Sequence, residues 1–95
     1  MNLRWTTKAR SDRSSIYHYI EVDNRTAAAK TDQRITNAAI SLLDFPGKGR
    51  AGKIEGTREW VVGDTPYILV YRIETDLIRI VRVMHGAQRW PKKMP

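Results

Sequence analysis

The chain has 95 residues, of which 41% are hydrophobic and 28% charged, and it contains no cysteine. This length supports one modest core, and the composition is that of a globular domain that folds without disulfides or metal. The absence of cysteine excludes disulfides, thiolate metal sites and cysteine nucleophiles. We therefore expect a single domain over residues 1–95 in a reducing compartment, with the cytoplasm as the default.

The formal charge of +7 and the pI near 10.1 predict attraction to a polyanion or to an acidic partner. Ten basic and five acidic residues follow Gly47, so most of the positive charge lies in the C-terminal half. No apolar run approaches the roughly 18 residues of a membrane span, and the first residues lack the apolar core of a signal peptide. We expect a soluble protein without a membrane partner.

A short strand over residues 3–6 is predicted to lead into a helix from Thr7 to about Asp23, with Thr6 or Thr7 as the N-cap. The apolar residues that recur at helical spacing in this segment are Ala9, Ile16, Tyr19 and Ile20.

Asn24 and Arg25 interrupt the first helix, and a second apolar pattern continues to Phe45, where Pro46 and Gly47 stop it. Because the link between the two helices is so short, they should form an antiparallel hairpin.

Residues 46–52 read as a loop, and the hydrophobic period then changes to about two, which is typical of strands. Strands are expected over residues 57–62, 67–74 and 77–85, antiparallel to one another because their connections are short. The predicted fold is α+β: an N-terminal strand and an antiparallel helical hairpin packed on one face of a small twisted, mainly antiparallel sheet, in the order β-α-α-β-β-β. Residues 89–95 are predicted to be a loosely attached tail.

Gly47, Gly49 and Gly52 match the spacing of a dinucleotide-binding loop, but here a helix precedes the glycines and a strand follows them. We therefore predict no cofactor and expect the glycines to provide unusual backbone angles. His18 and His85 have no Cys, Asp or Glu at ligand spacing, so we predict no metal site.

If the last strand alternates regularly, Arg79, Val81 and Val83 share one face, while Arg82 lies on the other with Ile80 and Met84. The arginines would then not form one patch. The strand residues Trp60 and Tyr71 suit packing better than stacking on bases. No serine-protease-like spacing and no pair of catalytic carboxylates is present, so an enzyme built on this chain would use Arg, Lys and His.

Several short motifs occur together in one order: Trp5-Thr6 with Ala9 and Asp12; Ile16 with Tyr19-Ile20; Asn24 with Ala27-Ala28; Phe45-Pro46 with Gly49-Arg50; Gly56-Thr57-Arg58-Glu59; Tyr67-Ile68 with Val70-Tyr71-Arg72; and Ile80-Val81-Arg82-Val83 with His85-Gly86 and Gln88. This ordered set resembles the ParE/RelE superfamily of bacterial toxins over nearly the whole chain. The resemblance implies the same α+β fold and a companion antitoxin, usually acidic in its toxin-binding segment, that binds and masks the toxin.

The superfamily divides by mechanism, and the resemblance alone leaves both branches open. RelE-like members cut messenger RNA on the ribosome, using basic side chains to stabilise the scissile phosphate, whereas ParE-like members act against DNA gyrase. Ile68 stands where the RNases commonly carry an Arg before a Leu-Val-Tyr core, and in place of paired lysines the preceding strand has only Arg58, followed by the opposite charge of Glu59. These departures favour a gyrase poison without chemistry of its own; the alternatives are a ribosome-dependent endoribonuclease and an inactive antitoxin-binding module.

The predicted site residues follow from this interpretation. Under the leading hypothesis no residue is catalytic, and under the RNase alternative the catalytic residues would be Arg58, Arg82 and His85. Contacts with the target are predicted at Lys53, Arg58, Arg82, His85, Arg89 and Trp90. Contacts with the antitoxin are predicted at Tyr17, Ile20, Arg72 and Arg79.

Overall fold

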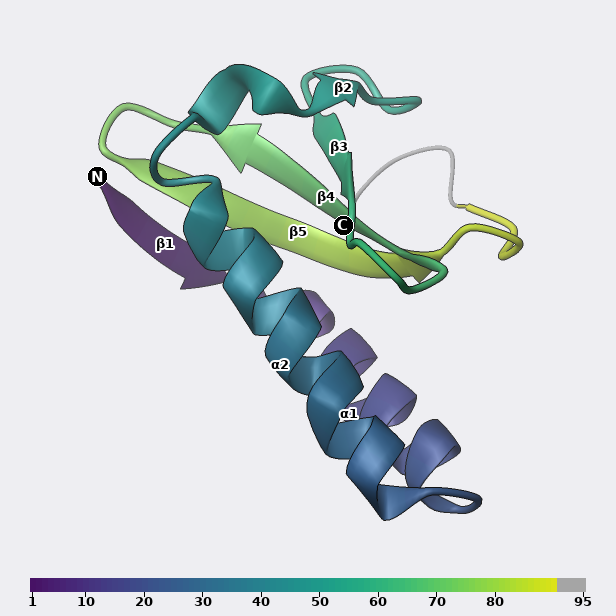
Figure 1. Cartoon of the computed structure of the whole chain (residues 1–95). Coiled ribbons are helices and arrows are strands. Elements are labelled where there is room, and N and C mark those ends of the chain that lie inside the picture. Colours follow the sequence, from purple (N-terminus) through teal and green to yellow (C-terminus); the bar gives the residue numbers. More distant parts are fainter. Residues whose placement is uncertain (91–95) are drawn as a thin grey trace.

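Two helices cover one face of a five-stranded mixed sheet in the computed structural model, which describes residues 1–90 (Figure 1). The elements in chain order are β1 (Asn2–Trp5), α1 (Thr7–Glu21), α2 (Arg25–Ser41), the 3-10 helix η1 (Pro46–Lys48), β2 (Arg50–Ala51), β3 (Arg58–Val61), β4 (Tyr67–Ile73) and β5 (Leu77–His85). The predicted α+β architecture is confirmed, with one strand more than expected.

The helical hairpin carries the chain from β1 at one edge of the sheet to β2 at the opposite edge, and β3, β4 and β5 then lead back to β1. The spatial order is β1-β5-β4-β3-β2, so the first and last strands are neighbours and pair in parallel. All other pairs are antiparallel, as their short connections predict. The turn between α1 and α2 projects beyond the sheet, as Figure 1 shows. One end of the hairpin is therefore anchored and the other stands away from the strands.

The first helix begins at Thr6, one of the two N-caps predicted, and the second is capped by Asn24, which was predicted only as a break. The Thr6 hydroxyl accepts a hydrogen bond from the Ala9 amide at 3.0 Å and donates one to the Val81 carbonyl at 2.9 Å. The Asn24 side chain accepts one from the Ala27 amide at 3.0 Å. Each cap satisfies an amide that the first helical turn leaves without a backbone partner.

The second helix is shorter than predicted and ends at Ser41 rather than at Phe45. Leu42 is fully buried, so the apolar pattern continues even though the backbone has already tightened into a turn. Periodicity reports which side chains are buried, and here it extends past the end of the α-helix.

The core lies between the hairpin and the sheet. Ala9, Ile35, Ala39 and Leu42 of the helical segment pack against strand residues that include Leu69, Tyr71, Ile78 and Ile80. Tyr19 was expected on the buried stripe of α1, but its side chain is 79% exposed. Tyr19 lies near the turn end of the hairpin, which extends past the sheet, so the sheet leaves its side chain largely uncovered.

Two local features of the sheet differ from the prediction. Arg50 and Ala51 form a two-residue edge strand against Glu59 and Arg58, within the segment that was expected to be a loop. In β5 the register with β4 shifts, because Val70 pairs with Arg82 and Tyr71 pairs with Ile80, which leaves Val81 as an extra residue.

This bulge overturns the regular alternation expected for β5. Val83 joins Ile78 and Ile80 in the same core cluster, so Val83 does not share a face with Arg79. Because one residue is unpaired, side chains after the bulge point to the face opposite to the one that regular alternation predicts. Hydrophobicity alone does not reveal this, since the residues around the bulge are nearly all apolar.

The predicted tail over residues 89–95 falls mostly outside the described residues, since only Arg89 and Trp90 are described. Among the described residues, no helix is long and apolar enough to cross a membrane.

Candidate functional site

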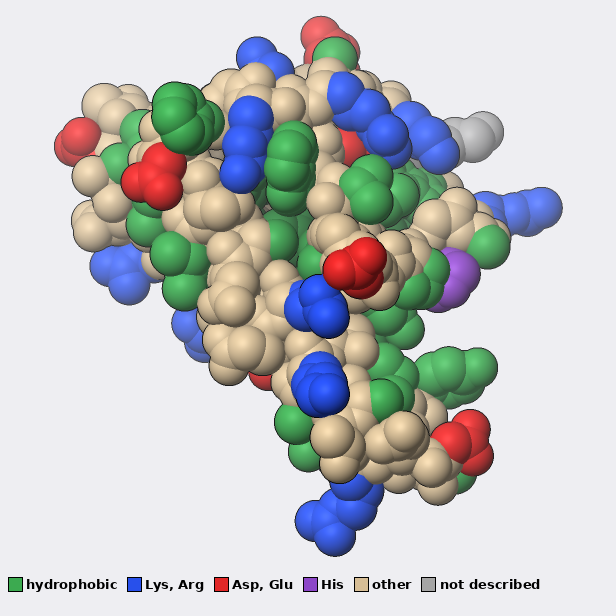
Figure 2. Space-filling view, viewed as in Figure 1, with side chains coloured by type: hydrophobic (Ala, Val, Ile, Leu, Met, Phe, Trp, Pro, Cys, Tyr) green, Lys and Arg blue, Asp and Glu red, His purple; other side chains and the backbone are tan. Residues whose placement is uncertain are grey.

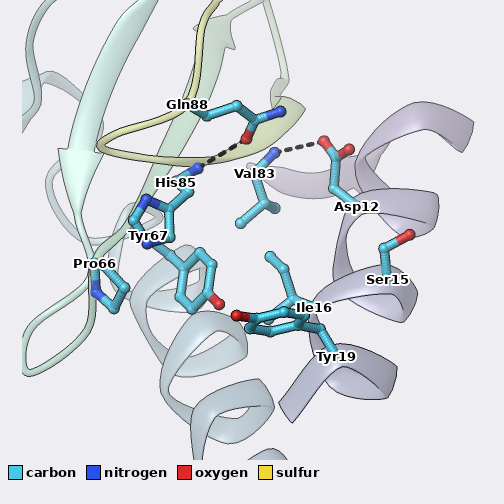
Figure 3. A pocket seen from close by; sticks show the side chains of 9 residues that line it. All are labelled: Asp12, Ser15, Ile16, Tyr19, Pro66, Tyr67, Val83, His85 and Gln88. Atoms are coloured by element: carbon cyan, nitrogen blue, oxygen red, sulfur yellow. Dashed lines mark hydrogen bonds between the residues drawn. The ribbon is translucent and has the colours of Figure 1, made fainter.

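A hollow of about 410 Å³ lies between α1 and the C-terminal end of β5. Figure 3 shows Ile16 and Tyr19 of α1 on one side, and Tyr67, Val83 and His85 of the sheet on the other. The walls are mainly apolar and aromatic, with polar groups at the rim, which is the composition of a surface that binds an apolar side chain.

The His85 ring is exposed at the rim of this hollow and is held in one orientation. Its Nδ1 accepts a hydrogen bond from the Ala87 amide at 3.0 Å, and its ring meets the ring of Tyr67 edge-on at 5.5 Å between centroids. The His85 amide donates to the Gln88 side chain at 3.2 Å. Because Nδ1 is an acceptor here, the proton of the neutral ring lies on Nε2.

The phenol of Tyr67 remains a neutral group at physiological pH. Burial raises the pKa of Tyr67, and the nearby Tyr19 acts in the same direction. Tyr67 therefore contributes an apolar ring and a hydroxyl to the hollow, and no negative charge.

Arg82 is largely buried in an ion pair with Asp12 of α1. Its Nε and Nη2 donate to the two carboxylate oxygens of Asp12 at 2.8 and 3.1 Å, and the side chains are only 10% and 11% exposed. The same carboxylate accepts the Val83 amide at 2.9 Å (Figure 3). Arg82 thus joins the N-terminal half of α1 to β5 and leaves little of its guanidinium for a partner.

Arg58 also bonds within the molecule. Its Nη1 donates to the carbonyl oxygens of Gly49 at 2.8 Å and of Gly47 at 3.3 Å. These bonds hold the segment before β2 against β3, so Arg58 contributes to the shape of this loop.

Glu59 and Tyr71 complete the support of the same loop. The Glu59 carboxylate, with a 1% exposed side chain, accepts two hydrogen bonds from Arg50 and one from the Lys53 amide. The Tyr71 hydroxyl donates to the Pro46 carbonyl at 2.6 Å and accepts from the Gly49 amide at 3.0 Å. The prediction that Tyr71 serves packing is confirmed, since it is fully buried in the core.

Two glycines of this loop, Gly49 and Gly52, are required for space rather than for unusual backbone angles, whereas a Cβ at Gly47 would meet no atom within 4 Å. A Cβ at Gly49 would lie 2.5 Å from the Tyr71 hydroxyl and 2.8 Å from the Glu59 carbonyl, while Gly56 alone among the described glycines has a positive φ, of 80°. The expectation of unusual angles at Gly47, Gly49 and Gly52 was therefore wrong.

Lys53, His85 and Trp90 lie together at one end of the molecule. The Lys53 ammonium lies 4.5 Å from the centroid of the Trp90 ring, and the Trp90 indole donates to the His85 carbonyl at 3.4 Å. Arg89 is exposed next to them. We call Lys53, His85, Arg89 and Trp90 the C-terminal surface.

Basic side chains gather over β2 and its flanking loops, as Figure 2 shows. A second stacked pair occurs there, because the Lys48 ammonium lies 4.4 Å from the centroid of Trp60 and donates to the Ser41 hydroxyl at 2.8 Å. Trp60 is partly buried against the core, as predicted.

The structure does not bring the four predicted antitoxin contacts together. Tyr17 and Ile20 lie on α1, where Ile20 is partly buried against the core. Arg72 and Arg79 are cross-strand neighbours in the sheet, and Arg79 donates two hydrogen bonds to Glu74.

Two residues that support the site were not predicted from the sequence. Asp12 and Glu59 are acidic residues whose partners, Arg82 and Arg50, become apparent only once the chain is folded. Residues 1–90 contain no group of three or more His, Asp or Glu side chains placed to hold a metal ion. His18 is exposed on α1 and bonds Glu21.

Comparison with known proteins adds independent information. Residues 3–90 match the family model described as the ParE toxin of the type II toxin–antitoxin system parDE. The chain is 44% identical over 90 residues to the protein Y4kP of Sinorhizobium fredii, covering 95% of this chain and 93% of that protein. It is 36% identical over 84 residues to the toxin RelE2 of Caulobacter vibrioides, covering 88% and 93% of the two chains.

Solved structures agree with these matches. A chain of the chromosomal ParDE system from P. aeruginosa superposes with a TM-score of 0.81 at 30% identity, over 90% of this chain and 95% of that one. The YoeB/ParE toxin from Agrobacterium tumefaciens superposes with a TM-score of 0.61 at 16% identity, over 90% and 98% of the two chains, and this likeness concerns the fold alone.

Proposed function

The chain belongs to the ParE toxin family of type II toxin–antitoxin systems, and we propose that it arrests growth by binding DNA gyrase, without a chemical step of its own. Membership of this family implies an antitoxin as partner. We further propose that the antitoxin neutralises the toxin and is acidic where it binds, because the toxin carries a charge of +7.

The observation that carries the non-catalytic proposal is the ion pair between Arg82 and Asp12. An arginine that stabilises a scissile phosphate has to point its donors at that phosphate, but two donors of Arg82 already bind a nearly buried carboxylate. Arg58 bonds two loop carbonyls in a similar way. Two of the three groups that an RNase mechanism would need are therefore engaged inside the molecule.

The C-terminal surface is the part of the predicted target-binding set that suits a protein partner. It combines cations with an aromatic ring, and Trp and Arg are enriched among residues that dominate binding energy in interfaces. Lys53 and Arg89 are exposed, so a partner can reach them without disrupting the core.

An endoribonuclease is the second candidate, and the position of His85 favours it. The ring is exposed at the edge of a hollow, and the nitrogen not bonded to Ala87 can exchange a proton with a bound group. Under this candidate Arg82 would have to leave Asp12 before it could bind phosphate.

The test is to induce the chain alone in growing bacteria and compare incorporation of labelled thymidine and labelled amino acids during the first minutes. A gyrase poison lowers DNA synthesis first, and purified protein then increases DNA cleavage by purified gyrase. An early arrest of translation with intact DNA synthesis contradicts the proposal and supports the RNase candidate. Normal growth with folded protein present contradicts toxin activity altogether.

A further inference from the structure

Three arginines lie side by side across three adjacent strands. Arg4 of β1 is the register partner of Arg79 of β5, and Arg79 is the register partner of Arg72 of β4. We call these residues the arginine row. Neighbouring strands in a sheet are about 4.8 Å apart, so the three side chains start from a line of backbone only about 10 Å long.

The arginine row lies on the sheet face that turns away from the helices. Arg79 stands between Ile78 and Ile80, which both belong to the core beneath the hairpin. Arg4 stands between Leu3 and Trp5, which pack against that core. Because successive side chains of a strand point to opposite faces, the row is directed to the other side of the sheet.

This arrangement is unfavourable for the isolated chain, because like charges directly opposite one another on a sheet repel. Among the described residues, the carboxylate bonded to the row is Glu74, which accepts two hydrogen bonds from Arg79, at 2.6 and 3.2 Å. These bonds hold the pKa of Glu74 below its usual value, and the charges of Arg79 and Arg72 act in the same direction. One carboxylate for three guanidinium groups leaves the row with a surplus of positive charge.

We propose that the arginine row is the site at which the antitoxin docks an acidic segment, with its carboxylates bonded to Arg4, Arg72 and Arg79. The proposal rests on the proposed function, since it takes the acidic partner to be the antitoxin. The proposal adds Arg4 to the predicted antitoxin contacts Arg72 and Arg79 and places these three residues in one continuous site.

The contact between Glu74 and Arg79 shows the chemistry that this site accepts. Both oxygens of the carboxylate are bonded by one guanidinium, which is the paired geometry that favours Arg over Lys. Acidic side chains of a partner can repeat this geometry at Arg4 and Arg72.

A single-stranded nucleic acid is a poorer fit, because such sites combine cations with aromatic rings that stack on the bases. The aromatic residues of this chain are engaged elsewhere. Trp5, Trp60, Tyr67 and Tyr71 belong to or pack against the core, Tyr17 and Tyr19 lie on α1, Phe45 follows α2, and Trp90 stacks with Lys53. The row therefore offers charge without a stacking platform.

The experiment compares two charge-matched triple variants of the full chain. One is R4Q/R72Q/R79Q in the row, and the other is K8Q/R25Q/K30Q at exposed positions of the hairpin. The probes are fluorescein-labelled polyglutamate and single-stranded polythymidylate of equal charge, with binding measured by fluorescence anisotropy. Thermal unfolding of each variant verifies that the fold is intact.

We expect the row variant to lose about tenfold or more in affinity for polyglutamate, and the hairpin variant to lose about twofold or less. Equal losses would mean that only net charge matters and would overturn the proposal. Tighter binding of polythymidylate than of polyglutamate by the wild type, lost in the row variant, would also overturn it.

Toxicity separates this inference from the function on which it rests. A row variant that has lost polyglutamate binding but still arrests growth supports both, because the row then serves the partner and not the target. If the wild type binds polyglutamate through the row but does not arrest growth, the proposed toxicity fails while the row is retained as an acidic-peptide site.

Discussion

The carboxylate of Asp12 binds the guanidinium of Arg82 although 70 residues separate them in the chain. The same carboxylate accepts the amide of Val83, so one side chain on α1 satisfies both a charged group and a backbone donor of β5. Beyond Ile80, where the register with β1 ends, this contact and the hydrogen bond from the Thr6 hydroxyl to the Val81 carbonyl join that edge of β5 to α1.

We predict that Asp12→Ala lowers the free energy of unfolding by about 3–5 kcal/mol, because it leaves the Arg82 charge nearly buried and unpaired. Urea denaturation measures the change. Ser11→Ala, at the exposed neighbouring position, is the control and should change stability by about 0.5 kcal/mol or less. The double variant D12A/R82M should recover part of the loss, since it removes the buried charge as well; a double variant less stable than Asp12→Ala would contradict this explanation.

Much of the fold was predictable because it depends on local signals. The N-cap at Thr6, the break at Asn24 and the change of hydrophobic period after residue 52 are each properties of a few consecutive residues. They predict the helices and the three C-terminal strands without information about distant partners.

What the sequence did not reveal depends on contacts between distant segments. The pairing of Arg82 with Asp12, and the edge strand formed by Arg50 and Ala51 against β3, exist only in the folded chain. The extra residue Val81 is invisible in an apolar run, although it decides that Val83 faces the core. The candidate site was therefore predictable as a set of basic residues, but not which of them are used internally.

Gly49 and Gly47 provide a matched pair for testing the loop before β2. We predict that Gly49→Ala destabilises the protein by about 1–3 kcal/mol, because the new methyl group would lie 2.5 Å from the Tyr71 hydroxyl and 2.8 Å from a backbone oxygen. Gly47→Ala meets no atom within 4 Å and should be close to neutral. Thermal unfolding of the two variants is the measurement, and equal effects would show that loop flexibility, rather than space, is what matters.

The buried phenol of Tyr67 predicts how stability changes at alkaline pH. Burial raises the pKa of Tyr67 above its ordinary value of 10.0, so the folded state binds this proton more tightly than the unfolded state. The resulting contribution is fully present below pH 10 and is lost as the pH rises through the folded-state pKa.

The stability of Tyr67→Phe relative to the wild type should therefore increase in alkaline solution. The difference in free energy of unfolding between the two proteins is expected to be constant up to about pH 9 and then to shift in favour of the Phe variant. Urea denaturation at a series of pH values tests this. A constant difference up to pH 11 would show that ionisation of Tyr67 does not limit alkaline stability.

The C-terminal surface predicts variants that lose toxicity while keeping the fold. Trp90→Ala removes the ring beneath Lys53, and an exposed cation–π contact of this kind contributes only about 0.5–1 kcal/mol to stability. Binding energy in an interface is concentrated in a few such residues, so the same substitution should weaken gyrase binding by tenfold or more, about 1.4 kcal/mol or above. We expect K53A/W90A to permit growth on induction without antitoxin, with thermal unfolding close to that of the wild type.

The control for this prediction is Lys30→Ala, which removes an exposed cation from α2. It should remain as toxic as the wild type, because loss of one charge alone does not remove the contact. His85→Ala completes the series and separates the two candidate functions. A general acid or base contributes roughly 100-fold or more to a rate, so an RNase would lose its activity. A gyrase poison should lose only the contacts of one ring of the C-terminal surface, because Ala keeps the backbone carbonyl to which Trp90 donates. If His85→Ala abolishes toxicity while K53A/W90A retains it, Lys53 and Trp90 are not the gyrase contact and the hollow beside His85 becomes the site of action.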